Sequence, residues 1–232
     1  MDAVEFDKFA EEYQSDHAKN LRCTGEDPDY FSRYKIEAIR RRWNSDARPE
    51  PKTILDFGTG IGNSLSFLAQ HFPAAALTAL DVSPRSLEIA ERRNPRLANF
   101  VLHRGGNRLP LKQGAFDLVF TSCVFHHIPA SEHIGLFAQL RALLAPNGVM
   151  ITFEHNPINP VTRYIVATCP FDENAVLIPA ARLAERQRKA GFSRVDINYT
   201  GFFPGALRAL RPLERFMTSL PIGAQYYSFA RA

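Results

Sequence analysis

A glycine-rich stretch between an apolar run and an amphipathic segment constrains this chain more than any other feature. It reads Thr53-Ile-Leu-Asp-Phe-Gly-Thr-Gly-Ile-Gly-Asn-Ser64, so Asp56 closes the apolar run and glycines follow at positions 58, 60 and 62. The order predicts a strand, a tight turn and a helix, because apolar residues then recur at helical spacing. Glycine permits backbone angles that a Cβ forbids, and it lets a ligand approach bare backbone. The N-terminus of the following helix offers unpaired N–H groups.

The next apolar segment, residues 75–80, predicts a second strand that ends on Asp81. An acid in this place, about 20 residues after a glycine turn, holds a ribose diol in nucleotide-binding sheets. The turn lacks the G-x-G-x-x-G pattern of dinucleotide enzymes, because Asn63 stands where the third glycine would fall. The two stretches therefore indicate a nucleotide site of another kind.

The stretch around the three glycines resembles motif I of class I S-adenosylmethionine-dependent methyltransferases. In the same way "TALDVSP" resembles the ribose-binding acidic loop of that family, "LPLKQGAFDLVF" its fourth strand and "LLAPNGVMITFEHNP" its fifth. The resemblance runs in order from Thr53 to Pro157, about half of the chain. It implies an α/β, doubly wound, Rossmann-like sheet of seven strands and S-adenosylmethionine as the cofactor. The last strand, Tyr226–Phe229, would insert antiparallel beside the fifth.

The chain is expected to divide into an N-terminal helical extension, residues 1–50, and a methyltransferase domain, residues 51–232. A long loop predicts a substrate-covering insertion at residues 155–180. In the resembling family, N-terminal helices often fold over the cofactor as a lid. The side chains that would then line a substrate pocket are Tyr13, His17, Tyr30 and Tyr34. The alternative, that these residues pack the helices onto the sheet, stays open.

The resemblance also assigns the cofactor contacts. They lie in the glycine turn, the acidic loop and the ends of the third and fourth strands: Asp56, Gly58, Thr59, Gly60, Gly62, Asp81, Val82, Gly106, Asn107 and Ser122. Asp56 would orient the glycine turn and hold the methionine ammonium group, and Asp81 would hold the ribose hydroxyls. One region departs from the family pattern. Relatives commonly place an aspartate a few residues before the Leu-Pro pair to bind the adenine amino group, and here the side-chain oxygen of Asn107 would substitute.

Polar residues follow the predicted fourth and fifth strands, where ligands bind in open α/β sheets. Glu154 is a candidate general base or a holder of a substrate cation, because a partly buried carboxylate can have its pKa raised. The alternative is a structural carboxylate that pins the following loop. His126 is expected to face substrate and to be a catalytic candidate, as is His155.

His127 is expected to be buried and to anchor the next helix, although it is also a candidate to touch substrate. Two more candidates for substrate binding follow the fifth strand, Asn156 and Arg163. No metal is expected at the histidine pair, because neighbouring side chains diverge in an extended chain and no further ligand set is evident.

The implied activity is transfer of a methyl group to a small-molecule acceptor, with oxygen favoured as the methylated atom. Lipid-linked, quinone, polyketide and sugar intermediates are the candidate acceptors. Two alternatives belong to other classes. A methyltransferase fold kept as a binding module without turnover is compatible with the missing adenine aspartate. A nicotinamide-dependent oxidoreductase is disfavoured by the glycine spacing and by the lack of a downstream Tyr-x-x-x-Lys pair.

Composition and charge indicate which kinds of partner and which compartment to expect. The net charge of +4 comes from dispersed arginines with no basic stripe, which argues against nucleic acid. Three cysteines without metal-ligand spacing and an N-terminus without signal-peptide character predict a cytoplasmic protein. A leucine face at residues 207–213, opposite arginines, could rest on an anionic membrane surface, but packing of these leucines on the sheet is favoured. The sequence carries no signal of oligomeric state.

Overall fold

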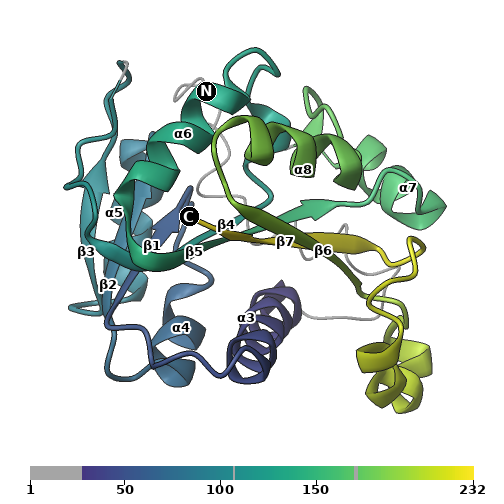
Figure 1. The fold of residues 1–232 in the computed structure, drawn as a ribbon. Helices are drawn as coiled ribbons and strands as arrows, with labels where there is room; N and C mark the ends of the chain where they lie inside the picture. Colours follow the sequence, from purple (N-terminus) through teal and green to yellow (C-terminus); the bar gives the residue numbers. More distant parts are fainter. Residues whose placement is uncertain (1–27, 107, 170–171) are drawn as a thin grey trace.

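The structure, a computed structural model, describes residues 28–106, 108–169 and 172–232. Its centre is one seven-stranded sheet in the order β3-β2-β1-β4-β5-β7-β6 (Figure 1). The parallel strands are β1 (Thr53–Phe57), β2 (Ala76–Asp81), β3 (Ala98–Leu102), β4 (Phe116–Ser122) and β5 (Leu144–His155). β7 (Gln225–Arg231) pairs antiparallel with β5 and with β6 (Arg194–Thr200). The predicted mixed sheet, with an antiparallel last strand beside the fifth, is confirmed.

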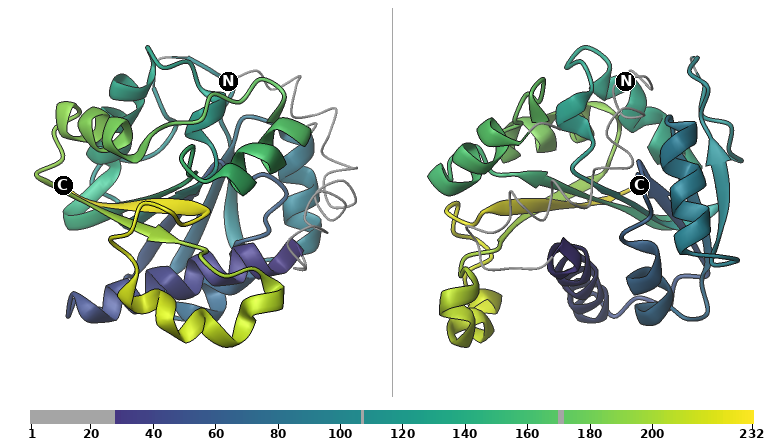
Figure 2. Two further views of the ribbon diagram at one scale, coloured as in Figure 1. Left: turned by 90° about the vertical axis from the view of Figure 1, so that its right-hand side faces the viewer. Right: turned by 180° about the vertical axis from the view of Figure 1, so that it is seen from behind.

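Helices cover both faces of the sheet (Figure 2). The core around α3 (Pro28–Ser45) and α4 (Leu65–His71) lies on one face, and the core around α6 (His133–Leu143) and α8 (Ala180–Lys189) lies on the other. The remaining elements are α5 (Pro84–Arg93), which contacts β2 and β3, the short 3₁₀ turn η2 (Phe125–His127), α7 (Pro160–Thr168) and the 3₁₀ segment η4 (Gly205–Phe216). This layering brings the carboxyl ends of the five parallel strands to one edge of the sheet.

α3 is a layer of the core. Ile36, Ile39 and Trp43 are at most 2% exposed, and they join a cluster that reaches the central strands. The Trp43 ring meets Phe72, directly after α4, edge-on, with ring centroids 6.1 Å apart. Over residues 28–45 the amphipathic helix therefore buries its apolar stripe against the sheet, and the covering of the cofactor by residues 1–50 stays a prediction. The first predicted helix, with Tyr13 and His17, lies outside the described residues.

β5 contains residues of a type that usually form turns, Pro146, Asn147 and Gly148. They lie inside the strand, because Leu144 already pairs with Phe116. The register shifts between Phe116 and Leu118, and Asn147 adopts a positive φ of 65°. Turn residues that tolerate this conformation are accommodated here as a bulge, so the strand bends without ending.

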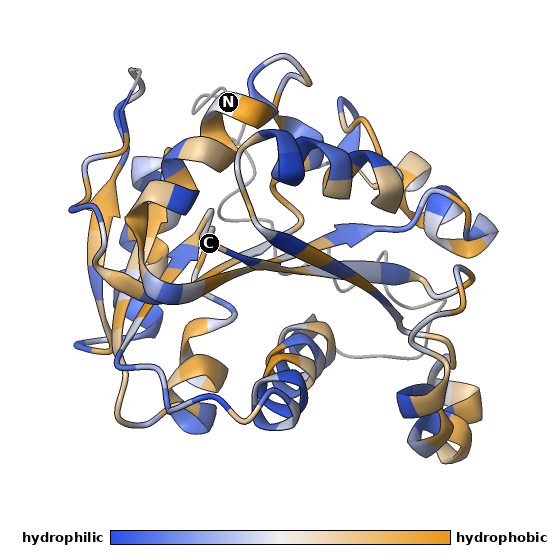
Figure 3. Cartoon of the chain, in the orientation of Figure 1, coloured by the Kyte–Doolittle hydropathy of each residue, from blue (hydrophilic) through white to orange (hydrophobic). Residues whose placement is uncertain are grey.

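Two C-terminal segments also differ from expectation. Residues 160–168, predicted as part of a long loop, form α7, whose first residue is a proline behind the capping side chain of Asn159. The leucines of η4 do not pack on the sheet: Leu207, Leu210 and Leu213 are 48%, 41% and 49% exposed. Orange segments mark this apolar surface at the lower right of Figure 3. In the described ranges, no helix combines the length and the apolarity that crossing a membrane requires.

Buried and exposed leucines should respond differently to replacement by alanine, measured as the change in the free energy of unfolding. Leu183 of α8 is fully buried, so Leu183→Ala should lower the free energy of unfolding by about 2–5 kcal/mol through lost contacts and a residual cavity. Leu213→Ala in η4 should lower it by less than about 1 kcal/mol. Urea titrations of both variants measure the difference, and equal losses would show that η4 is packed in solution.

Candidate active site

The glycine turn is closely packed at one glycine and open at another. Gly58 has a φ of +73°, and a Cβ added there would lie 2.4 Å from Cγ2 of Val124, which follows β4. Its N–H donates to the Leu80 carbonyl at the end of β2, at 2.8 Å. Gly60 also has a positive φ, but nothing lies within 4 Å of its added Cβ. The turn is thus fixed against the sheet at Gly58 and presents bare backbone at Gly60.

Asp81 joins the glycine turn to the loop after β2. Its Oδ2 accepts a hydrogen bond from the Gly60 N–H at 2.8 Å, and its Oδ1 accepts one from the Ser83 N–H at 2.9 Å. Ser83 in turn caps α5 by accepting from the Ser86 N–H. Val82 is half-buried between them. Asp81 thus places a carboxylate, the group that holds a ribose diol in nucleotide-binding sheets, at the end of β2 beside the glycine turn.

Asp56 is a buried acid beside this loop. Its Oδ2 accepts from the Thr59 hydroxyl at 2.8 Å. Burial raises the pKa of Asp56 to about 7, against the opposing hydrogen bond from Thr59, and the charge of Asp81 adds to the rise. Among the described residues, no basic side chain forms an ion pair with Asp56. A carboxyl group in this setting is a good partner for a cation from outside the chain.

A second cluster of polar groups lies where β4 and β5 end. Glu154 Oε1 accepts from the Phe125 N–H at 2.9 Å, and Oε2 lies 2.6 Å from His126 Nδ1. Burial alone would lower the pKa of His126, but the charge of Glu154 and the nearby Asp172 raise it to about 10. Burial likewise opposes ionisation of Glu154, yet His126 holds the pKa of that carboxyl below its usual value. The two groups form a buried ion pair that anchors η2 to β5.

The burial of the two adjacent histidines is the reverse of the prediction. His126 is 2% exposed, whereas His127 is only half-buried, so the prediction that His126 faces substrate and His127 anchors the next helix is wrong. The reason is that residues 125–127 form a 3₁₀ turn and not an extended segment. For the same reason the neighbouring rings converge, with centroids 4.2 Å apart, and the argument that they diverge is also wrong.

Asp172, from the segment after α7, completes this group. Its Oδ1 lies 3.3 Å from His126 Nε2 and 3.5 Å from His127 Nε2. Burial would raise the pKa of Asp172, but the close contact with His126 and the charges of the histidines lower it to about 2. Asp172 is not among the predicted site residues, because nothing in a loop sequence shows that it folds back over η2.

Lys35 of α3 reaches the end of β4 from the other face of the sheet. Its Nζ donates to Ser122 Oγ at 2.7 Å and lies 3.6 Å from Cys123 Sγ. Lys35 is buried, and among the described residues its ammonium has no carboxylate partner. The sequence analysis missed it; the available signal was a lysine at the border of the apolar stripe of an amphipathic helix.

Cys123 and His155 form the link between Lys35 and the histidine pair. Burial would raise the pKa of the Cys123 thiol, but the charges of His155 and Lys35 outweigh it and lower the pKa to about 6. Burial likewise opposes protonation of His155, and the charge of Cys123 raises the pKa of that imidazole nonetheless. The His155 ring lies 5.3 Å from the His126 ring, measured between centroids. The carboxyl edge therefore carries one continuous charged cluster.

The two predicted tyrosines of α3 contact other parts of the chain. The Tyr34 hydroxyl bonds Thr200 and Glu214 and accepts from the Gly201 N–H, so it joins α3 to β6 and η4. Burial and the charge of Glu214 raise the pKa of Tyr34. The Tyr30 ring lies under the Arg211 guanidinium, 4.3 Å from its centroid. These contacts agree with the packing alternative, and substrate binding by the two tyrosines stays a prediction.

Asn156 holds two segments of the chain together. Its amide nitrogen donates to the carbonyls of Pro221 and Gly223, and its oxygen accepts from the Ile158 N–H. These bonds connect the end of β5 to the loop before β7, and substrate binding by Asn156 stays a prediction. Gly106, predicted to touch the cofactor, is exposed with a φ of +102°, and Asn107 lies outside the described residues.

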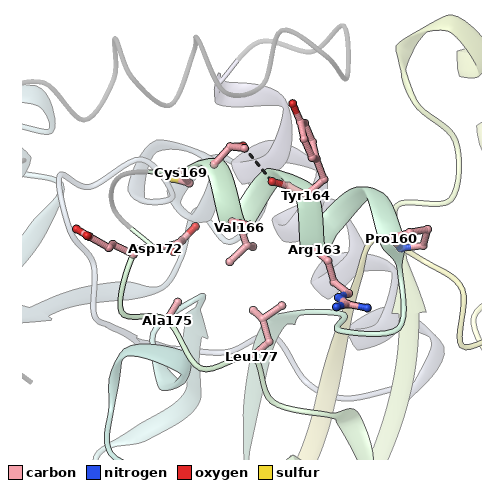
Figure 4. A pocket seen from close by; sticks show the side chains of 11 residues that line it. Pro160, Arg163, Tyr164, Val166, Cys169, Asp172, Ala175 and Leu177 are labelled. Atoms are coloured by element: carbon pink, nitrogen blue, oxygen red, sulfur yellow. Dashed lines mark hydrogen bonds between the residues drawn. The ribbon is translucent and has the colours of Figure 1, made fainter.

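A cavity of about 710 Å³ opens beside this cluster. Side chains of α7, including Arg163 and Tyr164, form one wall, and the segment from Asp172 to Leu177 forms the other (Figure 4). Its size is typical of a small-molecule site. Since Asp172 lines the cavity and also contacts both histidines, the charged cluster borders the space where a small molecule fits.

Comparison with known proteins agrees with this geometry. Residues 54–148 match a family model described as "Methyltransferase domain". A trans-aconitate 2-methyltransferase of Methylobacterium radiotolerans is 35% identical over 144 residues, covering 60% of this chain and 54% of that protein. A malonyl-[acyl-carrier protein] O-methyltransferase of Halalkalibacterium halodurans is 29% identical over 116 residues, covering 48% of this chain and 42% of that protein. The chain thus spans about half the length of the curated relatives it matches.

Solved structures give the same fold. An S-adenosylmethionine-dependent methyltransferase of Thermotoga maritima, described as a possible histamine N-methyltransferase, superposes with a TM-score of 0.68 at 17% identity, covering 98% of both chains. At this identity the likeness concerns the fold alone. The seven-stranded arrangement is an α/β, Rossmann-like methyltransferase fold.

The packing of the glycine turn predicts that alanine destabilises the protein more at position 58 than at position 60. Gly58→Ala should lower the free energy of unfolding by more than the roughly 1–2 kcal/mol that a left-handed backbone costs an L-residue, because its Cβ also meets Val124. Gly60→Ala should show only the backbone cost. Thermal unfolding of Gly58→Ala, Val124→Ala and the double variant tests the contact: the double variant should be more stable than the sum of the single effects, and strict additivity would contradict the clash.

Proposed function

We propose that this chain, which contains a class I S-adenosylmethionine-dependent methyltransferase domain, methylates a carboxylate oxygen of a small-molecule acid. The observation that carries the choice of acceptor is Lys35, a buried ammonium at the end of β4 without a carboxylate partner among the described residues.

The residues of the glycine turn suit S-adenosylmethionine, which supplies a methyl group already activated on a sulfonium. The open space at Gly60 admits a ligand against backbone, and Asp81 places a carboxylate beside the same turn, where ribose hydroxyls would donate to it. Asp56 offers a buried carboxyl for the methionine ammonium. These three features, from β1, the turn and β2, support binding of the amino-acid and sugar parts of one molecule.

Lys35 supports an anionic acceptor. A buried ammonium needs partners, because removal from water costs several kcal/mol unless they replace the solvent. An ammonium has three N–H donors. In the described residues Lys35 directs them at the Ser122 hydroxyl, at 2.7 Å, and at the Cys123 sulfur, 3.6 Å away. Against the effect of burial, Lys35 helps to lower the pKa of that thiol to about 6. A carboxylate of the acceptor would complete the set and lie beside the end of β4.

The state of Glu154 supports the same choice. Its two oxygens are engaged by the Phe125 N–H and by His126, inside a core where both side chains are 1% exposed. Glu154 therefore anchors η2 and is poorly placed to take a proton from a hydroxyl. A carboxylate acceptor requires no base, because it is already the nucleophile.

The names of the related proteins also support an acid as the methyl acceptor. Their names specify trans-aconitate and a malonyl group, and both carry carboxylates. Neither name fixes the acceptor of this chain, which matches only about half of each relative. The two alternatives from the sequence, a binding module and a nicotinamide-dependent oxidoreductase, are not favoured.

In the proposed reaction, an acceptor carboxylate oxygen forms a bond to the methyl carbon as the carbon–sulfur bond breaks, and the electron pair of that bond stays on sulfur. The chain has to hold the oxygen in line with the carbon–sulfur bond and to exclude water. Such orientation contributes up to about 7–11 kcal/mol to lowering a barrier. Lys35 would hold the acid, while the glycine turn and Asp81 would hold the donor.

The pKa of Asp56 predicts a pH dependence of cofactor binding. A carboxyl whose pKa is raised to about 7 is neutral below that pH and can pair with an ammonium only above it. Affinity for S-adenosylhomocysteine should therefore rise by up to about tenfold per pH unit below pH 7 and level off above it. Calorimetric titrations from pH 5.5 to 8 would measure this. Asp56→Asn should flatten the profile, and an unchanged slope in that variant would contradict the assignment.

The acceptor is tested by a screen with isotope-labelled S-adenosylmethionine, read by mass spectrometry. The panel contains small di- and tricarboxylic acids together with quinone, polyketide, sugar and lipid-linked hydroxyl compounds. Label should appear as a methyl ester, and label on a hydroxyl or nitrogen would contradict the proposal. Binding of S-adenosylhomocysteine without any labelled product would instead favour the binding module.

Once the screen has identified an acid substrate, Lys35→Met should raise the KM for that acid by about 10–100-fold, the range expected when a charge-assisted hydrogen bond is lost. Lys112→Met, which removes an exposed lysine elsewhere, is the matched control and should leave KM unchanged. Binding of S-adenosylhomocysteine should be the same in both variants. Equal KM values would remove Lys35 from the acceptor site.

A further inference from the structure

The side chains of His126, His127 and Asp172 bring three possible metal-ligand atoms close together. The ion pair between Glu154 and His126 does not by itself explain this arrangement. Their ligand atoms all lie within 4.8 Å of one another. Two of the separations, from Asp172 Oδ1 to the two Nε2 atoms, are 3.3 and 3.5 Å. Ligands bound at about 2.0–2.2 Å in a tetrahedral zinc site are roughly 3.4 Å apart. From this spacing we propose that the three side chains bind a divalent transition metal ion of the zinc class.

A second observation at His126 points to the same place. Its Nε2 is fully buried and makes no hydrogen bond, although it faces Asp172 at ion-pair distance. A buried nitrogen without a hydrogen bond is unusual in a folded protein and calls for a ligand or ion. A neutral imidazole would offer this nitrogen as a lone-pair donor to a metal.

The other nitrogen of the ring has the partner that metal-binding histidines usually have. His126 Nδ1 lies 2.6 Å from Glu154 Oε2, and Glu154 is itself held by the Phe125 N–H. A carboxylate behind a ligating histidine fixes the tautomer that leaves Nε2 for the metal and increases the basicity of the ligand. The arrangement carboxylate–histidine–metal is thus already in place on the protein side.

The ligand chemistry selects the ion. Two imidazoles and one carboxylate suit zinc, cobalt, iron or nickel, whereas magnesium and calcium prefer oxygen ligands. Three protein ligands leave at least one coordination position for an outside group.

The position of Asp172 gives the site a use that rests on the proposed function. Asp172 lines the cavity, so the open coordination position would adjoin the space where a small molecule fits. There the ion would hold a carboxylate oxygen of the acid, and Lys35 would hold the molecule from the β4 side. The metal would therefore select acids that carry a second anionic group.

The experiment is a direct binding measurement on the full chain after treatment with a chelator. Zn²⁺ is titrated by calorimetry, and Co²⁺ is titrated by its visible absorption, which reports coordination by nitrogen and oxygen ligands. One equivalent should bind. Asp172→Asn and His127→Gln should each weaken binding by more than tenfold, and Glu154→Gln by about 10–100-fold, the usual effect of losing the carboxylate behind a ligating histidine.

Two matched variants control for general loss of charge or imidazole. Glu173→Gln removes the exposed carboxylate next to Asp172, and His71→Gln removes the histidine at the end of α4; both should bind metal like the parent. Parent protein that binds no Co²⁺, or Asp172→Asn and His127→Gln variants that bind it as the parent does, would overturn the site. Thermal unfolding shows whether each variant is folded, and the two half-buried positions keep the test independent of the fully buried His126.

Failure of this proposal is separable from failure of the proposed function. S-adenosylhomocysteine binding is measured on the same chelator-treated samples, and it should be unaffected by removal of the metal. Normal binding of S-adenosylhomocysteine without metal binding would overturn the metal site alone. Metal binding without S-adenosylhomocysteine binding would overturn the proposed function alone.

Discussion

The buried pair of Glu154 and His126 is the interaction on which the site depends. Both side chains are 1% exposed and their nearest atoms are 2.6 Å apart, so each needs the other to remain charged in the core. Removing one partner of such a pair typically destabilises a protein by about 3–5 kcal/mol, because the remaining charge is left without compensation. The pair ties the end of β5 to the turn after β4. The positions of Cys123, His127 and Asp172 relative to the sheet follow from that connection.

Asp81 has the corresponding role in the cofactor half of the edge. It receives an N–H from the glycine turn and another from the loop before α5. The carboxylate thus sets the distance between two loops that would otherwise be joined only through the sheet. One acid therefore organises each half of the carboxyl edge, and the central strands β1 and β4 hold the halves in register.

Much of the fold could be predicted from the sequence, because its signals are local. The glycine turn, the acid after β2 and the apolar β7 each have a pattern that one short segment displays. The site was harder to predict because it depends on distant segments. Lys35 enters from a helix that the sequence suggested as a lid, and Asp172 returns from the segment after α7. The burial of His126 and His127 is the reverse of the prediction because both lie in a single 3₁₀ turn, and two adjacent histidines in a sequence do not indicate such a turn. The exposed leucines of η4 show the same limit, since helical spacing predicts an apolar face but not what covers it.

The placement of β7 has a consequence for synthesis of the chain. β7 lies between β5 and β6, and Phe229 and Ala230 are fully buried there. Because translation proceeds from the N-terminus, β5 and β6 are made before the strand that separates them exists. Until residue 231 has left the ribosome, β5 keeps an unpaired edge that could join the wrong neighbour. The final steps of folding must therefore follow translation of β7, and chaperones that shield strand edges would act in that interval.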